Sequence, residues 1–391
     1  MIKMDRKTWA VGMTGFCAFL ALYATQPLLP LFQRVFQASK LGVSLTVSAP
    51  TMAVALVAPW SGVIADVLGR KRVIVPAVFI LGLTNLLTAT SMGLPSLVAW
   101  RFVQGLFTPA VFAVTVAYIA EEWPAEQVGF ATSVYVTGTV LGGFTGRFLS
   151  GLIAPALDWR WAFVALGVLN IGLGAAVATW MPLAKRFDRR DGYLQSAHAM
   201  LKHLANSDLW AIFAVGFCIL FSLVGTFTYV TFHLAAPPYS LGTSKLGSIF
   251  FVYLIGAVIT PLVGRWGSRI KGRVTLALAL ATSALGVLLT LAAPLWIVVL
   301  GITLCASGVF VCQIVTNRAV GMVAKGSRAA AVGLYVTFYY FGGFVGSVVP
   351  GLLWAWGGWQ ACVALIVSVL VAASLYVALA WRDLEHVNAS R

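Results

Sequence analysis

The sequence predicts an all-α integral membrane protein whose twelve transmembrane helices form two six-helix pseudo-repeats. Hydrophobic residues make up 60% of the chain and charged residues only 9%, whereas soluble domains carry roughly 25% charged residues. The mean hydropathy is +0.94. Apolar runs of ~20 residues, enough to cross a ~30 Å hydrocarbon layer, recur along the whole chain, and the two halves resemble each other in sequence. This composition excludes a soluble fold.

Breaks at Gly, Pro and charged residues divide the chain into twelve expected spans. These are residues 9–31, 42–66, 73–92, 96–120, 128–152, 159–181, 209–235, 245–266, 274–292, 294–317, 329–353 and 359–381. One long polar interval separates six spans from six. We therefore expect an N-terminal six-helix bundle over residues 1–182, a cytoplasmic linker over 183–208 and a C-terminal six-helix bundle over 209–391. The basic start and the apolar run after it are interpreted as a retained first helix, because no small-residue cleavage site follows.

The basic residues predict the orientation of these spans. Of the 26 Lys and Arg residues, 20 fall at the termini and in alternate loops and 4 in the intervening loops, while Arg101 and Arg147 lie inside spans. By the positive-inside rule both termini are expected in the cytoplasm, as for a multi-pass protein of a bacterial cytoplasmic (inner) membrane. The net charge of +15 therefore reflects membrane topology, and no nucleic-acid partner is expected.

An internal repeat with an offset of 200 positions relates the two halves. Tyr135-Val136-Thr137 and Gly142-Gly143-Phe144 recur as Tyr335-Val336-Thr337 and Gly342-Gly343-Phe344, and Trp159 matches Trp359. Two parallel halves with a solute site between them at mid-membrane are a known transporter plan. Glycines spaced by four residues allow close approach of helices, and the residues expected to pack in this way are Gly138, Gly142, Gly146, Gly342 and Gly346.

The loop after the second expected span carries the most specific motif, formed by Gly62, Asp66, Gly69, Arg70 and Lys71. It resembles the signature loop of the major facilitator superfamily, in which Gly is followed four residues later by Asp and then by Gly-Arg-Lys. Val67 departs from that pattern, because the family often has a basic residue there. The resemblance implies the major facilitator fold and a gate in which Asp66 accepts hydrogen bonds in one conformation only. The alternative is an ordinary basic loop without a gating role.

Two further motifs resemble the drug:proton antiporter branch of that superfamily, which exports drugs and sugars. The segment from Arg101 through Gln104 resembles its Arg-x-x-Gln-Gly element, whose Arg is associated with coupling. Arg147 follows a Gly-rich stretch that resembles the antiporter motif, although Gly142-Gly143 replaces the usual Gly-Pro pair. An Arg inside a span costs about 2.5 kcal/mol or more, so a coupling or substrate role is expected for Arg101, Gln104 and Arg147. The alternatives are snorkelling of Arg101 to the nearby interface and purely structural roles.

Other polar and aromatic residues interrupt the spans. His233 is a further coupling or substrate candidate, and the expected cavity-lining residues are Tyr23, Gln26, Thr228, Tyr229, Tyr253, Gln313, Asn317, Tyr335 and Tyr339. Taken singly, such residues are more often helix-packing or interfacial residues. None of the eleven acidic residues falls in the middle of an expected span, so the interior is expected to be electropositive and the solute neutral or anionic. Any proton coupling would then use His233, Asp66 or the solute itself, because Arg does not titrate.

Soluble-enzyme motifs, an ATP-binding loop and Cys/His clusters are missing from the sequence. We therefore expect no enzymatic activity, cofactor or metal, and transport driven by gradients. The sequence favours a monomeric secondary transporter in the lipid bilayer. It is expected to export a small amphipathic solute by alternating access and proton-coupled antiport. One alternative is an uptake symporter or uniporter for a small organic metabolite, including an anionic one. The other is a non-transporting membrane receptor or scaffold.

Overall fold

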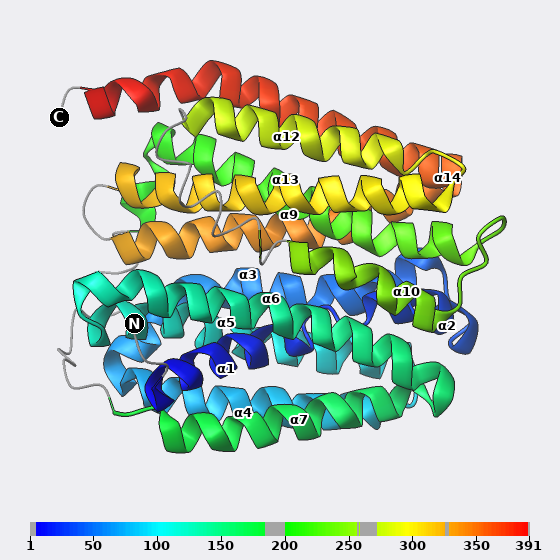
Figure 1. The fold of residues 1–391 in the computed structure, drawn as a ribbon, viewed down its shortest axis with the longest axis horizontal. Coiled ribbons are helices and arrows are strands. Elements are labelled where there is room, and N and C mark those ends of the chain that lie inside the picture. The colour runs from blue at the N-terminus through cyan, green and yellow to red at the C-terminus, as the bar shows by residue number, and fades with distance from the viewer. Residues whose placement is uncertain (1–4, 184–199, 256–257, 259–271, 325–327, 390–391) are drawn as a thin grey trace. The chain divides into compact units, whose positions relative to one another are not determined.

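The computed structural model describes residues 5–183, 200–255, 258, 272–324 and 328–389. Over these residues every regular element is a helix (Figure 1), and the predicted all-α class is confirmed. Eight helical stretches of the described residues are long and apolar enough to cross a membrane. Large hydrophobic side chains such as Trp161, Leu278 and Trp296 are exposed, as expected where lipid is the solvent.

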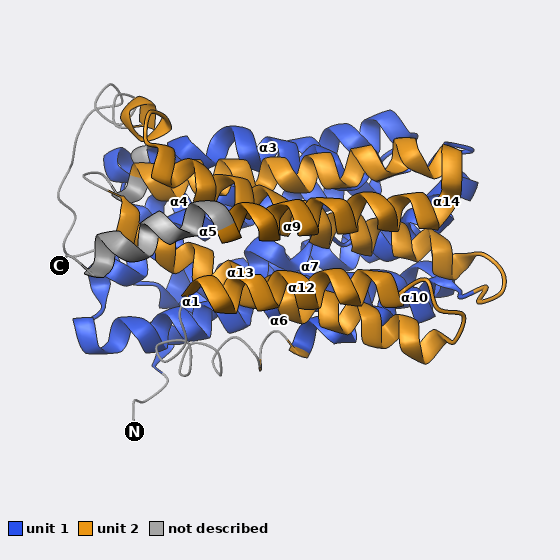
Figure 2. Cartoon of the chain, turned by 90° about the horizontal axis from the view of Figure 1, so that it is seen from above, with its two compact units in different colours: residues 1–192, 241–254 blue, residues 193–240, 255–391 orange. Residues whose placement is uncertain are grey.

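The chain divides into two compact units, shown in blue and orange in Figure 2. Unit 1 comprises residues 1–192 together with 241–254, and unit 2 comprises residues 193–240 together with 255–391. The expected bundle boundaries at residues 182 and 209 stay a prediction. Residues 184–199, which make up most of the expected linker, lie outside the described part of the chain.

Unit 1 contains ten helical elements among its described residues. They are α1 (Arg6–Leu20), η1 (Gln26–Leu28), α2 (Leu29–Val35), α3 (Lys40–Leu68), α4 (Arg70–Ala89), α5 (Leu94–Glu122), α6 (Ala125–Ala156), α7 (Trp159–Trp180), α10 (Thr243–Ile249) and η2 (Phe250–Val252). Polar side chains cap several helix N-termini: Asp5 accepts from the backbone N–H of Thr8, and Ser39 from that of Gly42. Five of the six expected spans of this half correspond to single helices.

The first expected span, residues 9–31, is not one continuous helix. α1 ends at Leu20, five turn residues follow, and the chain resumes helical structure at Gln26. Pro27 and Pro30 have no backbone N–H to donate, and their rings clash with carbonyls four residues earlier, in the preceding turn. The break exposes the backbone and side chains of residues 21–26 to neighbouring helices inside unit 1.

Unit 2 contains four long helices among its described residues: α9 (Ser207–Ala235), α12 (Gly272–Leu289), α13 (Leu295–Val323) and α14 (Arg328–Ala389). α14 covers the last two expected spans, and its helical geometry is interrupted at Gly357 and Gly358, where Gly358 has φ 59°. The expected span 245–266 begins with α10 and η2, whereas residues 256–257 and 259–271 lie outside the described chain. The sequence also has a degenerate counterpart of the signature loop over residues 264–273, of which only residues 272–273 are described.

The repeat seen in the sequence has a counterpart in the helix packing. α1 packs on α6 in unit 1, and α9 packs on α14 in unit 2. A Cβ at Gly142 would lie 2.2 Å from the carbonyl oxygen of Phe16, and one at Gly342 would lie 2.1 Å from that of Phe217. The two helix backbones of each pair are therefore in direct contact at matching positions of the two halves. Glycine permits this contact, since a larger side chain would not fit there.

Candidate functional site

The centre of the candidate site is Arg147, whose side chain is buried where α6 meets the break after α1. The residue is only 2% exposed. Its Nε donates a hydrogen bond to Oε1 of Gln26 over 2.8 Å, and its Nη1 donates to the carbonyl oxygen of Gly143 over 2.6 Å. Gln26 can reach Arg147 because it begins η1, after the chain has left the axis of α1.

Three aromatic rings surround the same guanidinium. The Cζ atom of Arg147 lies 4.8 Å from the ring centre of Tyr23, 5.0 Å from that of Phe250 and 4.6 Å from that of Tyr253. A desolvated cation–π contact of this kind contributes up to about 2 kcal/mol. We call Tyr23, Gln26, Arg147, Phe250 and Tyr253 the Arg147 site; all five belong to unit 1.

A second buried guanidinium, that of Arg101 on α5, is 0% exposed. Its Nε donates to the carbonyl oxygen of Thr46 over 3.2 Å, its Nη1 to Oε1 of Gln104 and its Nη2 to the carbonyl oxygen of Leu22. Gln104 in turn donates to Oδ1 of Asn85 on α4 over 3.2 Å. The side chain of Arg101 therefore does not snorkel toward an interface but joins four segments inside unit 1.

Neither buried guanidinium is neutralised by a carboxylate of the described chain. Arg70 pairs with Asp66 and Glu121, and Arg160 pairs with Asp158, whereas Arg101 and Arg147 form no ion pair with a described carboxylate. The acidic residues with described side chains lie at helix N-caps or within three residues of a helix end; they are Asp5, Asp66, Glu121, Glu122, Glu126, Asp158 and Asp208. The interior of unit 1 around Arg101 and Arg147 is consequently electropositive.

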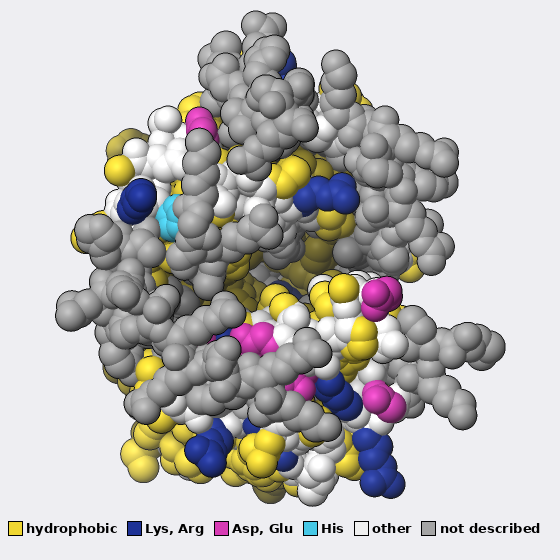
Figure 3. Space-filling view, turned by 90° about the vertical axis from the view of Figure 1, so that its left-hand side faces the viewer, with side chains coloured by type: hydrophobic (Ala, Val, Ile, Leu, Met, Phe, Trp, Pro, Cys, Tyr) yellow, Lys and Arg dark blue, Asp and Glu magenta, His cyan; other side chains and the backbone are white. Residues whose placement is uncertain are grey.

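The signature-loop residues form a separate cluster at the junction of α3 and α4. Nη2 of Arg70 lies 2.5 Å from Oδ1 of Asp66 and 2.7 Å from Oε1 of Glu121, and Nε of Arg70 donates to Oε2 of Glu121 over 3.1 Å. Gly69, with φ 93°, makes the turn between the two helices. Gly62 accepts a longer hydrogen bond from Arg70 through its carbonyl oxygen, and Lys71 is half-buried beside them. Acidic and basic side chains are also visible together on the face of the molecule in Figure 3.

The candidate residues of unit 2 make several contacts within the described part of that unit. His233 stacks on Trp359, with ring centres 5.7 Å apart. The hydroxyl of Tyr229 donates to the carbonyl oxygen of Ser347 over 2.7 Å, and the hydroxyls of Tyr335 and Thr316 lie 2.9 Å apart. The ring of Tyr339 lies against that of Tyr335, Thr228 is fully buried, Gln313 is half-buried, and Asn317 is exposed.

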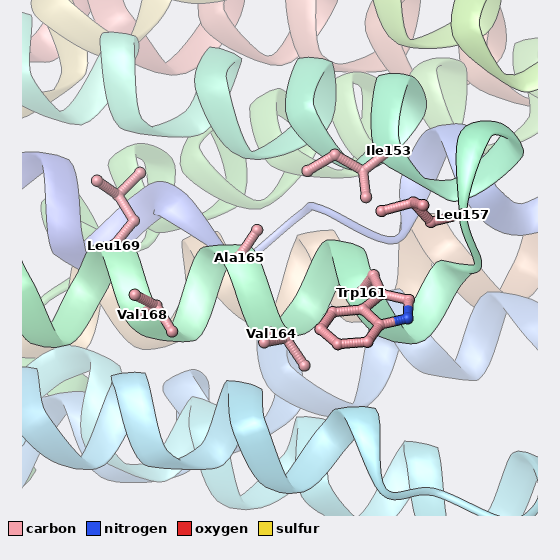
Figure 4. Close-up of a pocket in the computed structure, with 7 residues that line it drawn as sticks. All are labelled: Ile153, Leu157, Trp161, Val164, Ala165, Val168 and Leu169. Carbon is pink, nitrogen blue, oxygen red and sulfur yellow. The ribbon is translucent and has the colours of Figure 1, made fainter.

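The lining of an apolar groove on unit 1 includes none of the candidate residues (Figure 4). Its lining comes from α6 and α7 and consists of Ile153, Leu157, Trp161, Val164, Ala165, Val168 and Leu169. A solute site combines apolar surface with a few polar groups that fix orientation. This lining offers none, so the groove suits lipid chains better than a charged solute.

Three residues of these clusters were not predicted from the sequence: Asn85, Glu121 and Phe250. Asn85 has a sequence signal, since a single amide inside an apolar span requires a hydrogen-bond partner. Glu121 stands at the end of a span on the same side as the signature loop, but nothing in the sequence pairs it with Arg70. Phe250 is an apolar residue in an apolar span, and no pattern distinguishes it.

Comparison with known proteins identifies what the chain resembles. The family model described as Major Facilitator Superfamily matches residues 11–258 and 234–391. The uncharacterized MFS-type transporter YybF of Bacillus subtilis is 30% identical over 94% of this chain and 91% of that protein. The inner membrane transport protein YnfM of Escherichia coli is 28% identical over 95% of this chain and 89% of that protein.

Solved structures with the same fold are more distant in sequence. The human organic anion transporter MFSD10 matches with a TM-score of 0.74 and 18% identity, covering 95% of this chain and 99% of that one. The xylose transporter XylE from E. coli matches with a TM-score of 0.75 and 15% identity, covering 95% of this chain and 96% of that one. At these identities the match shows the fold alone.

Proposed function

Because this chain belongs to the Major Facilitator Superfamily and is therefore a membrane transporter and not an enzyme, we propose that it exports a small amphipathic solute. The solute is neutral or anionic, and transport proceeds by alternating access with proton-coupled antiport. The observation that carries the choice of solute is the pair of buried guanidiniums, Arg101 and Arg147, without a neutralising carboxylate in the described chain.

The size of the electrostatic effect argues against a cationic solute. Two unit charges 4 Å apart interact by about 4 kcal/mol at an effective dielectric constant of about 20. A cation near Arg147 is repelled by an energy of that order, while an anion is attracted by it. A carboxylate beside a guanidinium would offset this effect, and the described acidic side chains lie at helix ends instead.

The fold does not decide the substrate. The two solved neighbours are named as transporters of an organic anion and of xylose, so one architecture accommodates charged and uncharged solutes. The choice for this chain therefore has to come from its own residues, and the Arg147 site combines a positive charge with aromatic surface. An amphipathic solute with a polar or anionic end and an apolar body fits that combination.

Proton coupling through the two arginines is excluded by their chemistry, because a guanidinium keeps its proton at physiological pH. The remaining carriers are His233, Asp66 and the solute itself. A weak-acid solute would carry its own proton equivalent across the membrane. The bacterial cytoplasmic membrane is the proposed location; the similar E. coli protein is named as an inner membrane transport protein.

Measurement of solute content in whole cells tests the direction of transport. Cells that express the protein should hold less of an added amphipathic solute than cells with an empty vector, and a protonophore should abolish the difference. Higher content in the expressing cells would support the uptake symporter or uniporter. Complete inertness of purified protein in proteoliposomes toward anionic, neutral and cationic solutes would support the receptor or scaffold and contradict the proposal.

A further inference from the structure

The two buried arginines differ in how many of their nitrogens are bonded. A guanidinium carries five N–H donors on three nitrogens. All three nitrogens of Arg101 donate to oxygens of Thr46, Gln104 and Leu22. Arg147 donates through Nε and Nη1 only, and its Nη2 has no hydrogen-bond acceptor among the described residues. Each nitrogen of Arg101 therefore has an acceptor, whereas Nη2 of Arg147 has none in the described part of the chain, although the residue is only 2% exposed.

The internal repeat shows that the packing of this helix pair does not require an arginine. Gly146 lies against the carbonyl of Leu20 in unit 1, and Gly346 lies against the carbonyl of Phe221 in unit 2. The residue after Gly346 is Ser347, whose hydroxyl donates to the carbonyl of Phe344 in its own helix. The equivalent of Arg147 in the other half is thus a small neutral residue. Burial of a charge costs several kcal/mol, so packing alone does not account for Arg147.

The break after α1 is also restricted to one half. α9 continues as a helix to Ala235, well beyond Phe221, whereas α1 ends at Leu20. This break brings Tyr23 and Gln26 to the guanidinium of Arg147. Unit 1 therefore differs from unit 2 in two ways, by a charged residue on α6 and by a break after its first helix. Both differences occur at the guanidinium of Arg147.

We propose that Arg147 binds the carboxylate or a similar oxyanion group of the transported solute through Nη2, and that Arg101 is a structural clamp. The rings of Tyr23 and Tyr253 lie beside the guanidinium and provide the surface for the apolar body of the solute. Phe250 and Tyr253 cover the site, so the solute enters when the segment of α10 and η2 moves away from α6. This inference rests on the proposed transport function and specifies the solute group that the protein recognises.

The competing explanation is that the three rings alone satisfy Arg147. Each ring offers its face to the cation and contributes up to about 2 kcal/mol, which offsets much of the burial cost. The face of a ring does not provide an oxygen acceptor, and among the described residues Arg147 donates hydrogen bonds through Nε and Nη1 and not to a tyrosine hydroxyl. Hydrogen bonds between a guanidinium and a carboxylate are among the strongest in proteins. The two explanations differ in what happens when the guanidinium is neutralised without a change of shape.

Two matched substitutions separate them. Gln26→Glu places a carboxylate against Nε of Arg147, and Gln104→Glu makes the same change against Arg101. Binding of naphthalene-2-carboxylate and of its uncharged analogue, naphthalene-2-carboxamide, is measured by calorimetry on protein purified in an uncharged detergent. Gln26→Glu should weaken binding of the carboxylate by about tenfold or more, as expected for a loss of about 1.4 kcal/mol, and change binding of the carboxamide less than about threefold. Gln104→Glu should leave the ratio of the two affinities unchanged.

Arg147→Lys and Arg147→Gln complete the series. The lysine retains the charge but loses the planar fork, so carboxylate affinity should fall between those of the wild type and the glutamine variant. Equal effects of Gln26→Glu and Gln104→Glu on the affinity ratio, or no effect of either, would overturn the inference. So would a wild type that binds the carboxylate no more tightly than the carboxamide. If the wild-type protein still transports the carboxamide in proteoliposomes, the proposed transport function is retained. If the wild-type protein transports neither compound, the proposed transport function is contradicted as well.

Discussion

Arg70 holds two carboxylates with one guanidinium and so connects the end of α3 to the end of α5. Its side chain is 8% exposed, while those of Asp66 and Glu121 are 30% and 35% exposed. Both carboxylates are partly open to solvent, which screens an ion pair, and fully exposed pairs contribute only about 0–1 kcal/mol. The position of this cluster at helix ends suits a contact that forms in one conformation and breaks in another.

We expect Asp66→Asn to leave membrane insertion intact and to impair turnover strongly. The substitution removes one of the two carboxylates that form ion pairs with Arg70 and leaves the other, that of Glu121, in place. Transport per molecule in proteoliposomes, at matched protein content, measures the effect, and Arg72→Gln, at an exposed position two residues after Arg70, provides the control. Wild-type turnover by Asp66→Asn would contradict the gating role.

We expect Arg101→Gln to lower thermal stability more than Arg147→Gln. Loss of Arg101 leaves the carbonyl of Leu22 without this donor and leaves that of Thr46 with the long bond of 3.5 Å from the hydroxyl of Thr25. An unsatisfied buried group costs about 1–3 kcal/mol. Loss of Arg147 removes a buried charge and takes one donor each from the side chain of Gln26 and the carbonyl of Gly143. Melting temperatures in one detergent provide the comparison, and a reversed order would show that Arg147 is the structural residue.

The sequence predicted both arginines as important but not the difference between them. Arg101 and Arg147 are visible as charges inside spans, whereas the acceptors of Arg101 are backbone carbonyls 55 and 79 positions away. Backbone acceptors have no sequence signature. Glu121 escaped prediction for a similar reason, because its partner Arg70 is 51 positions away.

At the scale of helices, some prolines lie inside continuous helices and others stand where a helix is interrupted. Pro50 and Pro59 lie inside the continuous helix α3, and Pro109 lies inside α5. Pro27 and Pro30 stand only three residues apart, and there the helix breaks. Two prolines in one turn remove two backbone donors from neighbouring positions. The two prolines in the sequence favour an interruption of the first span, but the extent of the break depends on how residues 21–26 pack against α6.

We expect Gly146→Ala to separate α1 from α6 and to lower the melting temperature. A Cβ at this position would lie 1.5 Å from the carbonyl oxygen of Leu20, and overpacking of this kind typically costs about 1–3 kcal/mol. Gly129→Ala on the same helix is the matched control, because a Cβ there meets nothing within 4 Å. A melting temperature equal to that of Gly129→Ala would show that the two helices do not need this close contact.

At the scale of the whole molecule, most span positions followed from apolar runs and the family from the signature loop, since both are local patterns. The membership of Leu241–Leu254 in unit 1 could not be predicted, because it depends on contacts such as Gly151 with Gly247 that lie far apart in the chain. The orientation of the termini stays a prediction from the basic loops.

Cysteine accessibility tests that orientation. Single cysteines at Gln37 and Ser240, both exposed, should react with an impermeant thiol reagent added outside cells that express an otherwise cysteine-free protein. A cysteine at Asp191, which lies outside the described residues, should react only after the membrane is opened. The opposite pattern would place the termini outside the cytoplasm.

The central claim is that an electropositive interior selects a neutral or anionic solute, and a flux series tests it most directly. Export of naphthalene-2-carboxylate, naphthalene-2-carboxamide and 2-naphthylmethylammonium is measured for the wild type, Arg101→Gln and Arg147→Gln at several pH values around neutrality. We predict that the wild type prefers the carboxylate or the carboxamide to the ammonium solute, and that Arg147→Gln selectively loses carboxylate export. Preference of the wild type for the ammonium solute, undiminished in both variants, would contradict the claim.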